Sequence, residues 1–519
     1  MLYGLHRMQP APRHERPYGM DAPCEAGPQE VRRGVVHLAV AGGVVIALSL
    51  ASYLFPGLDR VRPWLPGEGP PIARLFFDDD AEAPSTAIAT GGAVSSPEAS
   101  TPDEDPLAAL VEEPEITEPP PVVDAQHGVR VEPSELEGLV REIEDPSGRA
   151  MRAFYDSLRR TASRDGGHVT RIAHFGDSTI ALDGITMTVR QRMQQRFGDA
   201  GHGFVLAARG SLPYRHHDVR HESEGRWSIY EITRLPLADG RYGLGGVQSR
   251  ASSGATAWFS SDEDGTVGRS VSRFTIFYQR HPRGGHVQYR VDDGEWLVLD
   301  TEGTQPEDAI HPIEVPDGHH RLSLRAAGHG ESRLYGVTLD REGPGVSYDS
   351  LGFVGARASR MLGFTPQTLG AQLGFRDTSL VIIAFGGNDA DDDRDQADFE
   401  RTFREVARLV RTARPEASCL LFAPLDQAER DSRGAVRTLP SVPLIVNAMR
   451  AAAAAEGCAF FDTWTAMGGE GSMGRWFRRQ PRLSSGDFRH ATPAGYRVVG
   501  TMLYQALLAG FAHDLESRR

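Results

Sequence analysis

The chain has 519 residues, of which 40% are hydrophobic and 8% aromatic, so it is long enough for about three domains with packed cores. Its three cysteines are too few for a disulfide framework or a four-cysteine metal site. The net charge is −14, but residues 78–124 hold 13 acidic and no basic side chains, so the rest is close to neutral, which argues against a nucleic-acid partner.

The first 55 residues contain a candidate membrane anchor. Residues 1–33 are polar and lack periodicity, which predicts a disordered tail. The next segment, from Gly34 to Phe55, has no formal charge, and a helix of its 22 residues would be about 33 Å long, enough to cross a bilayer. Arg32 and Arg33 precede it, so we expect a single pass with the N-terminus in the cytoplasm. The alternative is a signal peptide cleaved near Ala51, although the long leader favours an uncleaved anchor.

Residues 56–130 are predicted to form a disordered linker. They are rich in proline and acidic side chains, and no aromatic residue occurs between positions 78 and 128. Such a segment cannot bury enough apolar surface to offset the entropy lost on ordering. We therefore expect a solvated tether between the membrane and the catalytic part of the chain, which would lie outside the cytoplasm.

Two stretches, 131–204 and 343–519, alternate helical and strand patterns. Helices are expected at 133–143, 148–164 and 183–197, and buried strands at 168–175, 378–385, 418–423 and 457–461. Strands joined by crossover helices predict an α/β domain built on a parallel sheet. Between them, residues 205–342 carry short alternating runs with a hairpin signal at Asp293-Gly294, which predicts an inserted antiparallel β-sandwich or jelly roll.

Candidate reactive groups follow three of these segments. Ser178 comes after the first strand, Asn388 after the strand at 378–385, and Asp487 and His490 precede the last helix. A serine hydroxyl becomes a nucleophile when a histidine takes its proton, and a carboxylate three residues away can hold that histidine. Sites in open parallel sheets form at the carboxyl ends of the strands, so we expect these side chains to meet there.

An ester-cleaving serine also needs donors for the developing oxyanion. The candidates are the backbone N–H of Ser178, the side-chain amide of Asn388 and a glycine N–H. Gly355 is the preferred glycine, and Gly352 is the alternative one motif step away. No GxSxG sequence surrounds Ser178, which disfavours an α/β-hydrolase.

The ordered motifs resemble those of the SGNH (GDSL-type) hydrolase family. They are Gly176-Asp177-Ser178, a mid-chain glycine, Gly386-Gly387-Asn388-Asp389 and Asp487-Phe488-Arg489-His490. The resemblance implies a flavodoxin-like parallel sheet with helices on both faces, and it implies that Gly176, Asp177, Gly387 and Asp389 support the site. A closer resemblance is to the envelope peptidoglycan O-acetylesterases of this family. It rests on the inserted β region and on three segments, FGDAGHGF (197–204), GVSYDSLGFVGA (345–356) and MGGEGSMGRW (467–476). In those relatives the insertion resembles a carbohydrate-binding module.

Other residues carry weaker signals. The adjacent pairs His216-His217 and His319-His320 diverge in direction and make poor metal sites, so we expect neither a metal nor another cofactor. Trp476 lies either at the mouth of the site or in surface packing. Cys419 and Cys458 fall on predicted strands and are interpreted as buried free thiols.

These expectations combine into one functional hypothesis. The chain is predicted to be a membrane-anchored serine esterase that removes O-acetyl groups from an envelope polysaccharide such as peptidoglycan through an acyl-serine intermediate. Transfer of the acyl group to a sugar hydroxyl, giving an acetyltransferase, is one alternative. A non-catalytic, membrane-tethered polysaccharide-binding protein is the other. The sequence leaves the natural acyl group, the glycan and the oligomeric state open.

Overall fold

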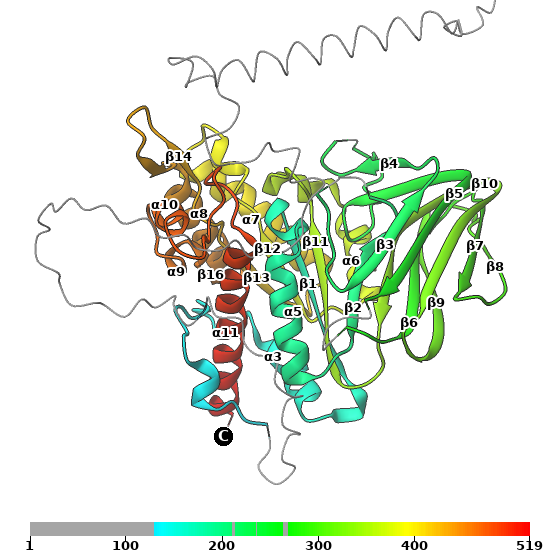
Figure 1. The fold of residues 1–519 in the computed structure, drawn as a ribbon, viewed down its shortest axis with the longest axis horizontal. Helices are drawn as coiled ribbons and strands as arrows, with labels where there is room; N and C mark the ends of the chain where they lie inside the picture. The colour runs from blue at the N-terminus through cyan, green and yellow to red at the C-terminus, as the bar shows by residue number, and fades with distance from the viewer. Residues whose placement is uncertain (1–109, 111–128, 210–212, 235, 263–267, 519) are drawn as a thin grey trace, which may run out of the picture. The chain divides into compact units, whose positions relative to one another are not determined.

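The computed structural model describes residues 110, 129–209, 213–234, 236–262 and 268–518 (Figure 1). The predicted tail, the membrane segment from Gly34 to Phe55 and nearly all of the linker lie outside these residues. Among the described helices, none combines the length and apolar character that a bilayer crossing requires. The anchor therefore stays a prediction from sequence.

A five-stranded parallel sheet forms the centre of the α/β part. It comprises β1 (Val169–Gly176), β11 (Gly345–Gly352), β12 (Leu380–Ala384), β13 (Ser418–Phe422) and β16 (Ala459–Phe461). Their spatial order is β11-β1-β12-β13-β16, and every neighbouring pair is parallel. Counted along the chain this is the order 2-1-3-4-5 of flavodoxin-like sheets. The predicted parallel α/β fold is confirmed.

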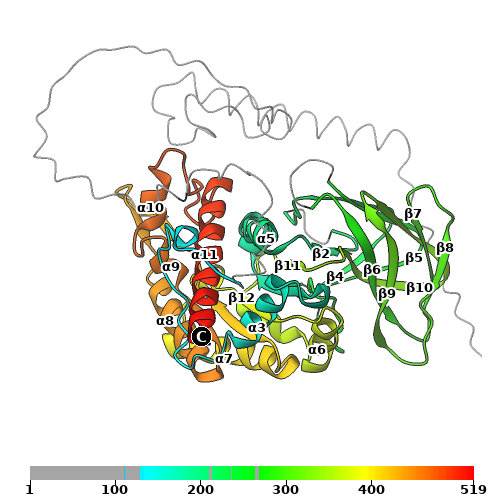
Figure 2. The same cartoon turned by 90° about the horizontal axis from the view of Figure 1, so that it is seen from below.

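Helices cover both faces of this sheet, which explains why its strands are almost continuously apolar (Figure 2). Ile382 of β12 packs into the core that includes α5 (Gly184–Phe197) and α11 (Pro493–Ser517), together with α3 (Arg152–Ala162). Ile383, the next residue, packs into the opposite core, whose helices are α6 (Pro366–Phe375), α7 (Gln396–Ala413) and α8 (Ser441–Glu456). Successive side chains of a strand point to opposite faces, so each strand serves both cores.

Short elements connect these helices and strands. They are η3 (Pro133–Leu136), η4 (Asp165–Gly167), α4 (Ser178–Ala181), η5 (Ala358–Gly363), η6 (Asp389–Asp391), β14 (Ala428–Arg430), β15 (Val436–Thr438), α9 (Thr463–Ala466) and α10 (Ser472–Phe477). The helix expected at 133–143 is wrong, because only the single turn η3 forms there. Gly138 has φ +83°, a left-handed conformation that an α-helix cannot continue through.

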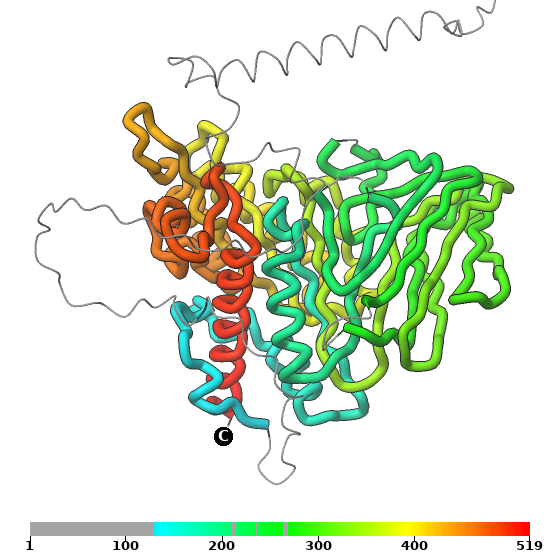
Figure 3. Tube along the Cα trace, in the orientation of Figure 1, coloured from blue at the N-terminus to red at the C-terminus, as the bar shows by residue number. Residues whose placement is uncertain are grey.

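Between α5 and β11 the chain builds an antiparallel region and then returns to the parallel sheet (Figure 3). Its strands are β2 (Gly201–Leu206), β3 (Val219–Glu224), β4 (Ser228–Glu231), β5 (Val247–Ser261), β6 (Val271–Arg280), β7 (His286–Val291), β8 (Leu297–Asp300), β9 (Glu307–Gly318) and β10 (Arg321–Asp340). The long strand β10 pairs with β5 along most of its length, with β7 near its start, and with β6 and β2 towards its end. The predicted antiparallel architecture is confirmed, and β7 and β8 form the hairpin expected around Asp293-Gly294.

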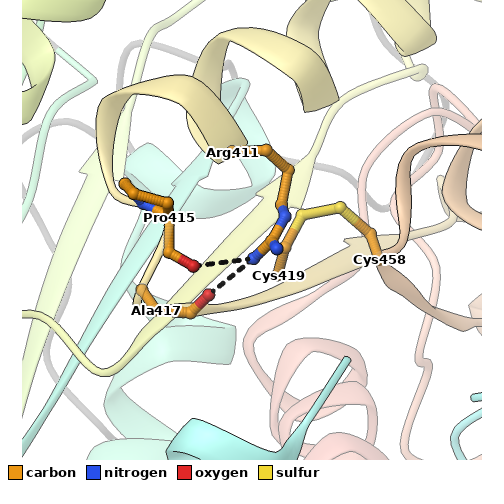
Figure 4. Close-up of a disulfide and its surroundings, with 5 residues drawn as sticks. All are labelled: Arg411, Pro415, Ala417, Cys419 and Cys458. Atoms are coloured by element: carbon orange, nitrogen blue, oxygen red, sulfur yellow. Dashed lines mark hydrogen bonds between the residues drawn. A yellow bond between two sulfur atoms is a disulfide. The ribbon is translucent and has the colours of Figure 1, made fainter. Parts of the chain in front are cut away.

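Cys419 and Cys458 form a disulfide, so the prediction of free thiols is wrong (Figure 4). Cys419 lies in β13, and Cys458 comes immediately before β16. The register aligns Leu420 with Ala459, which places the two preceding residues opposite each other with Cα atoms 4.8 Å apart. Both half-cystines are buried. The pairing follows from strand order in space, which the spacing of cysteines along the chain does not reveal.

Candidate active site

The candidate site lies where the strand order reverses, between β1 and β12. Ser178 is the first residue of α4 and follows the carboxyl end of β1, while Asn388 follows the carboxyl end of β12. Crevices at such switch points are the usual binding sites of open α/β sheets. Gly176 permits this arrangement, because a Cβ there would lie 2.7 Å from the carbonyl oxygen of Ala384 on β12.

The structure brings Ser178, His490 and Asp487 into one hydrogen-bonded chain. The Ser178 Oγ is 3.1 Å from His490 Nε2, and His490 Nδ1 is 2.7 Å from Asp487 Oδ2. Since an ionised carboxylate only accepts, the Nδ1–H donates to Asp487 and leaves Nε2 to accept from the serine hydroxyl. This is the arrangement in which an imidazole can remove the serine proton.

The turn from Asp487 to His490 keeps the carboxylate charged and aimed at the ring. Asp487 Oδ1 accepts the backbone N–H of Arg489 at 3.0 Å and of His490 at 3.1 Å. Partial burial raises the pKa of Asp487, but these N–H groups and the imidazole outweigh it and hold the pKa below its ordinary value. Phe488 has φ +56° within the turn, and its ring packs on Phe477 at 5.1 Å between centroids. That packing anchors an otherwise unfavourable backbone conformation.

Three candidate donors lie on the loops that follow the neighbouring strands β11, β1 and β12. The Ser178 N–H is at the start of α4, where a helix has no acceptor of its own to offer it. Gly355, with φ +71°, is the third residue of a turn closed by the Ala356 N–H on the Phe353 carbonyl at 3.0 Å. This position of a type II turn favours glycine and leaves its N–H outside the turn's own hydrogen bond.

Asn388 and Gly352 differ in what they contribute. One hydrogen of Asn388 Nδ2 is donated to the Ala356 carbonyl at 3.1 Å, which fixes the amide beside the Gly355 turn and leaves its second hydrogen for another acceptor. Gly352 instead ends β11, and a Cβ there would lie 2.1 Å from the Ala181 nitrogen. Gly352 therefore permits close packing on α4, and the geometry favours Gly355 as the N–H donor.

Two buried carboxylates tie the three loops together. Asp177 accepts the N–H and hydroxyl of Thr179 at 3.0 and 2.8 Å, and its carboxylate lies against Gly387, whose N–H lowers its pKa, so the serine loop packs directly on the asparagine loop. Asp389 accepts the N–H of Ala358 at 3.1 Å and joins the asparagine loop to the glycine loop. A Cβ at Gly387 would lie 3.0 Å from Asp177 Oδ2, so a side chain there would crowd the carboxylate.

Burial perturbs both carboxylates. It raises the pKa of Asp177, although hydrogen bonds from Thr179 oppose the rise. It also raises the pKa of Asp389 to about 6, where the Ala358 N–H opposes the rise and the neighbouring Asp177 adds to it. Burial removes water from both carboxylates, and their hydrogen bonds hold the loops in place. They therefore affect the reaction by positioning the loops.

Several expectations about the surroundings need correction or addition. Trp476 is buried and donates its indole N–H to the Met467 carbonyl at 3.1 Å, so it lies in the core and not at the mouth of the site. Gln427, which the sequence did not single out, donates to the Arg489 carbonyl at 3.3 Å and braces the histidine turn. The described residues hold no group of three His, Cys, Asp or Glu side chains with metal-binding geometry.

A serine hydrogen-bonded to a histidine that is itself held by a carboxylate is the catalytic arrangement of the serine hydrolases. Residues 315–498 match the GDSL-like lipase/acylhydrolase family. The chain is accordingly a serine esterase with an SGNH (GDSL-type) hydrolase fold. No curated protein sequence matches the chain.

Solved structures are similar to the chain to different degrees. A peptidoglycan O-acetylesterase superposes with a TM-score of 0.59 and 22% identity, covering 72% of this chain and 98% of the other, so the two share a fold. A family two carbohydrate esterase from Cellvibrio japonicus gives a TM-score of 0.18 and 13% identity, over 46% and 86% of the two chains. A Corynascus thermopiles (Myceliophthora fergusii) carbohydrate esterase of family 2 with a carbohydrate-binding domain gives a TM-score of 0.25 and 14% identity. That match covers 55% of this chain and 99% of the other.

Proposed function

We propose that this esterase removes O-acetyl groups from an envelope polysaccharide such as peptidoglycan, while anchored to the cytoplasmic membrane with its catalytic domain outside. The observation that carries the chemistry is the hydrogen-bonded chain from Ser178 through His490 to Asp487. The shared fold with a peptidoglycan O-acetylesterase supports the choice of substrate class.

The reaction begins with attack of Ser178 Oγ on the ester carbonyl as His490 Nε2 takes the hydroxyl proton. Asp487 stabilises the resulting imidazolium, and its lowered pKa keeps it ionised for that task. The oxyanion is held by the N–H groups of Ser178 and Gly355 and by the second amide hydrogen of Asn388. Collapse of the tetrahedral intermediate breaks the bond to the sugar oxygen, which takes the proton from His490 and leaves an acetyl-serine.

Water completes the cycle. His490 removes a proton from water, the resulting hydroxide attacks the acetyl-serine carbonyl, and the same donors hold the second oxyanion. Acetate departs and Ser178 regains its proton. A sugar hydroxyl in place of that water would make the same chain an acetyltransferase, so the acceptor decides between the two reactions.

The disulfide supports the proposed location outside the cytoplasm. Disulfides persist in oxidising compartments and are rare where cellular thiols keep cysteines reduced. The bond between Cys419 and Cys458 is buried beside the parallel sheet, in the hydrolase part of the chain. Its presence agrees with an anchor formed by residues 34–55 and a linker that carries the enzyme away from the membrane.

The test measures acetate released from O-acetylated peptidoglycan by the full chain in detergent. Ser178→Ala is expected to lower the turnover by roughly 10⁴- to 10⁶-fold. Saponified peptidoglycan, which has lost its esters, is the substrate control. Turnover by Ser178→Ala that equals the wild type would overturn the nucleophile, and acetyl transfer to an added oligosaccharide without acetate release would replace the esterase by a transferase. Absence of turnover on the polymer despite activity on small acetyl esters would overturn the substrate.

A further inference from the structure

Two arginines contact a pair of phenylalanine rings at the turn that carries His490. Phe488 belongs to this turn, and its ring centroid is 5.1 Å from that of Phe477, at the end of α10. The guanidinium carbon of Arg430 lies 5.0 Å from the centroid of Phe488. The guanidinium carbon of Arg482 lies 4.6 Å from the centroid of Phe477. We call these four side chains the arginine–phenylalanine stack: Arg430, Phe488, Phe477 and Arg482.

Main-chain contacts attach the stack to the histidine turn. The Ala428 N–H, in β14, donates to the Phe488 carbonyl at 3.0 Å, and β14 pairs with β15 in a short hairpin. The Arg482 carbonyl accepts the Thr492 hydroxyl at 2.6 Å, two residues after His490. Figure 1 shows β14 at the end of the hydrolase part where α11 begins. Phe488 is two residues before the histidine, so their Cα atoms are at most about 8 Å apart, and a polymer bound at the site can reach the stack.

Neither guanidinium of the stack has a carboxylate within 4 Å among the described residues. Arg430 donates one N–H to the Gly434 carbonyl at 2.9 Å, and the Arg482 side chain makes no hydrogen bond with the described part of the chain. Both side chains are exposed. Arg489, in the same turn, differs because it pairs with Asp391 at 3.0 Å. The N–H edges of the two stacked arginines are therefore available to a ligand.

The segments around the stack carry an excess of positive charge. Residues 428–438 and 468–490 hold eight arginines and four acidic residues, whereas the chain outside residues 78–124 is close to neutral. Two of the four acids are already engaged, Asp431 with Arg437 at 2.9 Å and Asp487 with His490 at 2.7 Å. An excess of one sign of charge beside a crevice attracts ligands of the opposite sign. The surroundings of the stack therefore favour an anionic part of the substrate.

Guanidinium groups held against rings suit a carboxylate ligand. Arginine binds a carboxylate through two parallel hydrogen bonds. The ring faces restrict the guanidinium groups before the ligand arrives, which reduces the entropy lost on binding. The spacings within the stack are each about 5 Å, so one extended ligand can meet both arginines.

We propose that the arginine–phenylalanine stack is a specificity site of the esterase, and that it binds carboxylates on the sugar chain that carries the ester. It holds this chain beside Ser178 and takes no part in the acyl transfer. The inference rests on the proposed function, because it concerns the substrate of the same site. Binding to a remote part of the substrate that is equally strong in the ground and transition states lowers KM and leaves kcat unchanged. Removal of the two guanidinium groups should therefore raise KM for carboxylated substrates alone.

The first measurement is binding without turnover. The full chain carrying Ser178→Ala is titrated in detergent with O-acetylated oligogalacturonate, a carboxylated sugar chain, by isothermal titration calorimetry, and O-acetylated dextran of equal length is the uncharged control. Adding Arg430→Gln/Arg482→Gln is expected to weaken binding of the oligogalacturonate at least about tenfold and to leave binding of the dextran unchanged. A matched variant, Arg149→Gln/Arg401→Gln, removes the same charge from exposed arginines elsewhere in the hydrolase part and is expected to bind as its parent does.

The second measurement is acetate release by chains that keep Ser178. Arg430→Gln/Arg482→Gln is expected to raise KM for the acetylated oligogalacturonate about tenfold with kcat unchanged, and to hydrolyse p-nitrophenyl acetate as the wild type does. A role confined to holding the histidine turn would instead lower kcat on every ester, and that result would overturn the proposal. If the double variant does not fold, Arg482→Gln alone provides the test, since Arg482 is exposed and its side chain makes no hydrogen bond with the described residues.

The remaining outcomes separate the stack from general charge attraction. Equal weakening by the two double variants, unchanged binding after loss of the stack, or equal weakening of dextran binding would each overturn the proposal. Absence of oligogalacturonate binding by the Ser178→Ala chain would do the same. Failure of the proposed function gives a different result, because a chain that releases no acetate from any polymer still shows whether binding depends on the stack.

Discussion

The buried carboxylate of Asp389 makes the stability of the protein depend on pH in a way that Asp389→Asn should remove. Its pKa is about 6 in the folded chain, against an ordinary value of 3.8 that we take for the unfolded chain. A group that holds its proton more tightly when folded stabilises the fold at low pH. That contribution is lost as the pH rises from about 4 to about 6.

The difference between these pKa values corresponds to a total change of about 3 kcal/mol in the free energy of unfolding, from a pH well below 4 to a pH well above 6. Asparagine keeps an oxygen for the Ala358 N–H but cannot ionise, so the variant does not lose this stability as the pH rises. The free energy of unfolding of Asp389→Asn minus that of the wild type should therefore increase by about 2 kcal/mol between pH 4 and pH 7, because part of the change has already occurred at pH 4. Taking the difference between two pH values removes any constant effect of the new amide.

Urea denaturation of both proteins at pH 4 and pH 7 measures this change. Asp393→Asn is the matched control, because Asp393 is exposed four residues further along the chain and its variant should show no such change. An Asp389→Asn difference that is the same at both pH values, or that falls as the pH rises, would refute the assignment of a raised pKa to this carboxyl group.

Three further predictions concern the catalytic chain and the disulfide. Asp487→Asn should lower kcat roughly 10⁴-fold, because an amide no longer fixes the imidazole with Nε2 free to accept from Ser178, and the loss is measured with p-nitrophenyl acetate. Asn388→Ala should lower kcat roughly 10²- to 10³-fold through loss of one oxyanion donor, with little change in KM, whereas a KM effect alone would assign the amide to ground-state binding. Replacing Cys419 and Cys458 by Ala should destabilise the fold by about 3–4 kcal/mol, since the bond closes a loop between residues 39 positions apart. Dithiothreitol should then lower the urea midpoint of the wild type but not of the double variant.

The parallel sheet was predictable because strands buried on both faces are nearly all apolar, as in Leu380–Ala384. Because parallel strands bring their carboxyl ends to one edge, the sequence also placed Ser178 and Asn388 in the same crevice. The features that could not be predicted from the sequence are contacts between segments that become neighbours only in the folded structure. The packing of Asp177 on Gly387 and the hydrogen bond of Asp389 with Ala358 join residues that no spacing relates, and Gln427 binds the histidine turn from 62 positions away.

The errors have the same origin. A pattern that predicts a helix at 133–143 is interrupted by the left-handed Gly138, and Trp476, expected at the mouth of the site or in surface packing, is buried in the core instead. The two glycines near the site show that the space around a residue is not visible in the sequence. Motif order prefers Gly355 but leaves Gly352 open, whereas in the structure a Cβ would strike the α4 backbone at Gly352 and meet open space at Gly355.

The long helix α11 begins at Pro493, directly after the histidine turn, and Thr492 caps it by accepting the Gly495 N–H. Most of its side chains are buried, and it packs against α5, the helix that follows the nucleophile. The turn that carries His490 is therefore continuous with a helix packed in the interior of the domain. A chain truncated just after His490 would keep Ser178, Asp487 and His490 in its sequence. It would nevertheless lack activity, because no helix would hold the imidazole against the serine hydroxyl.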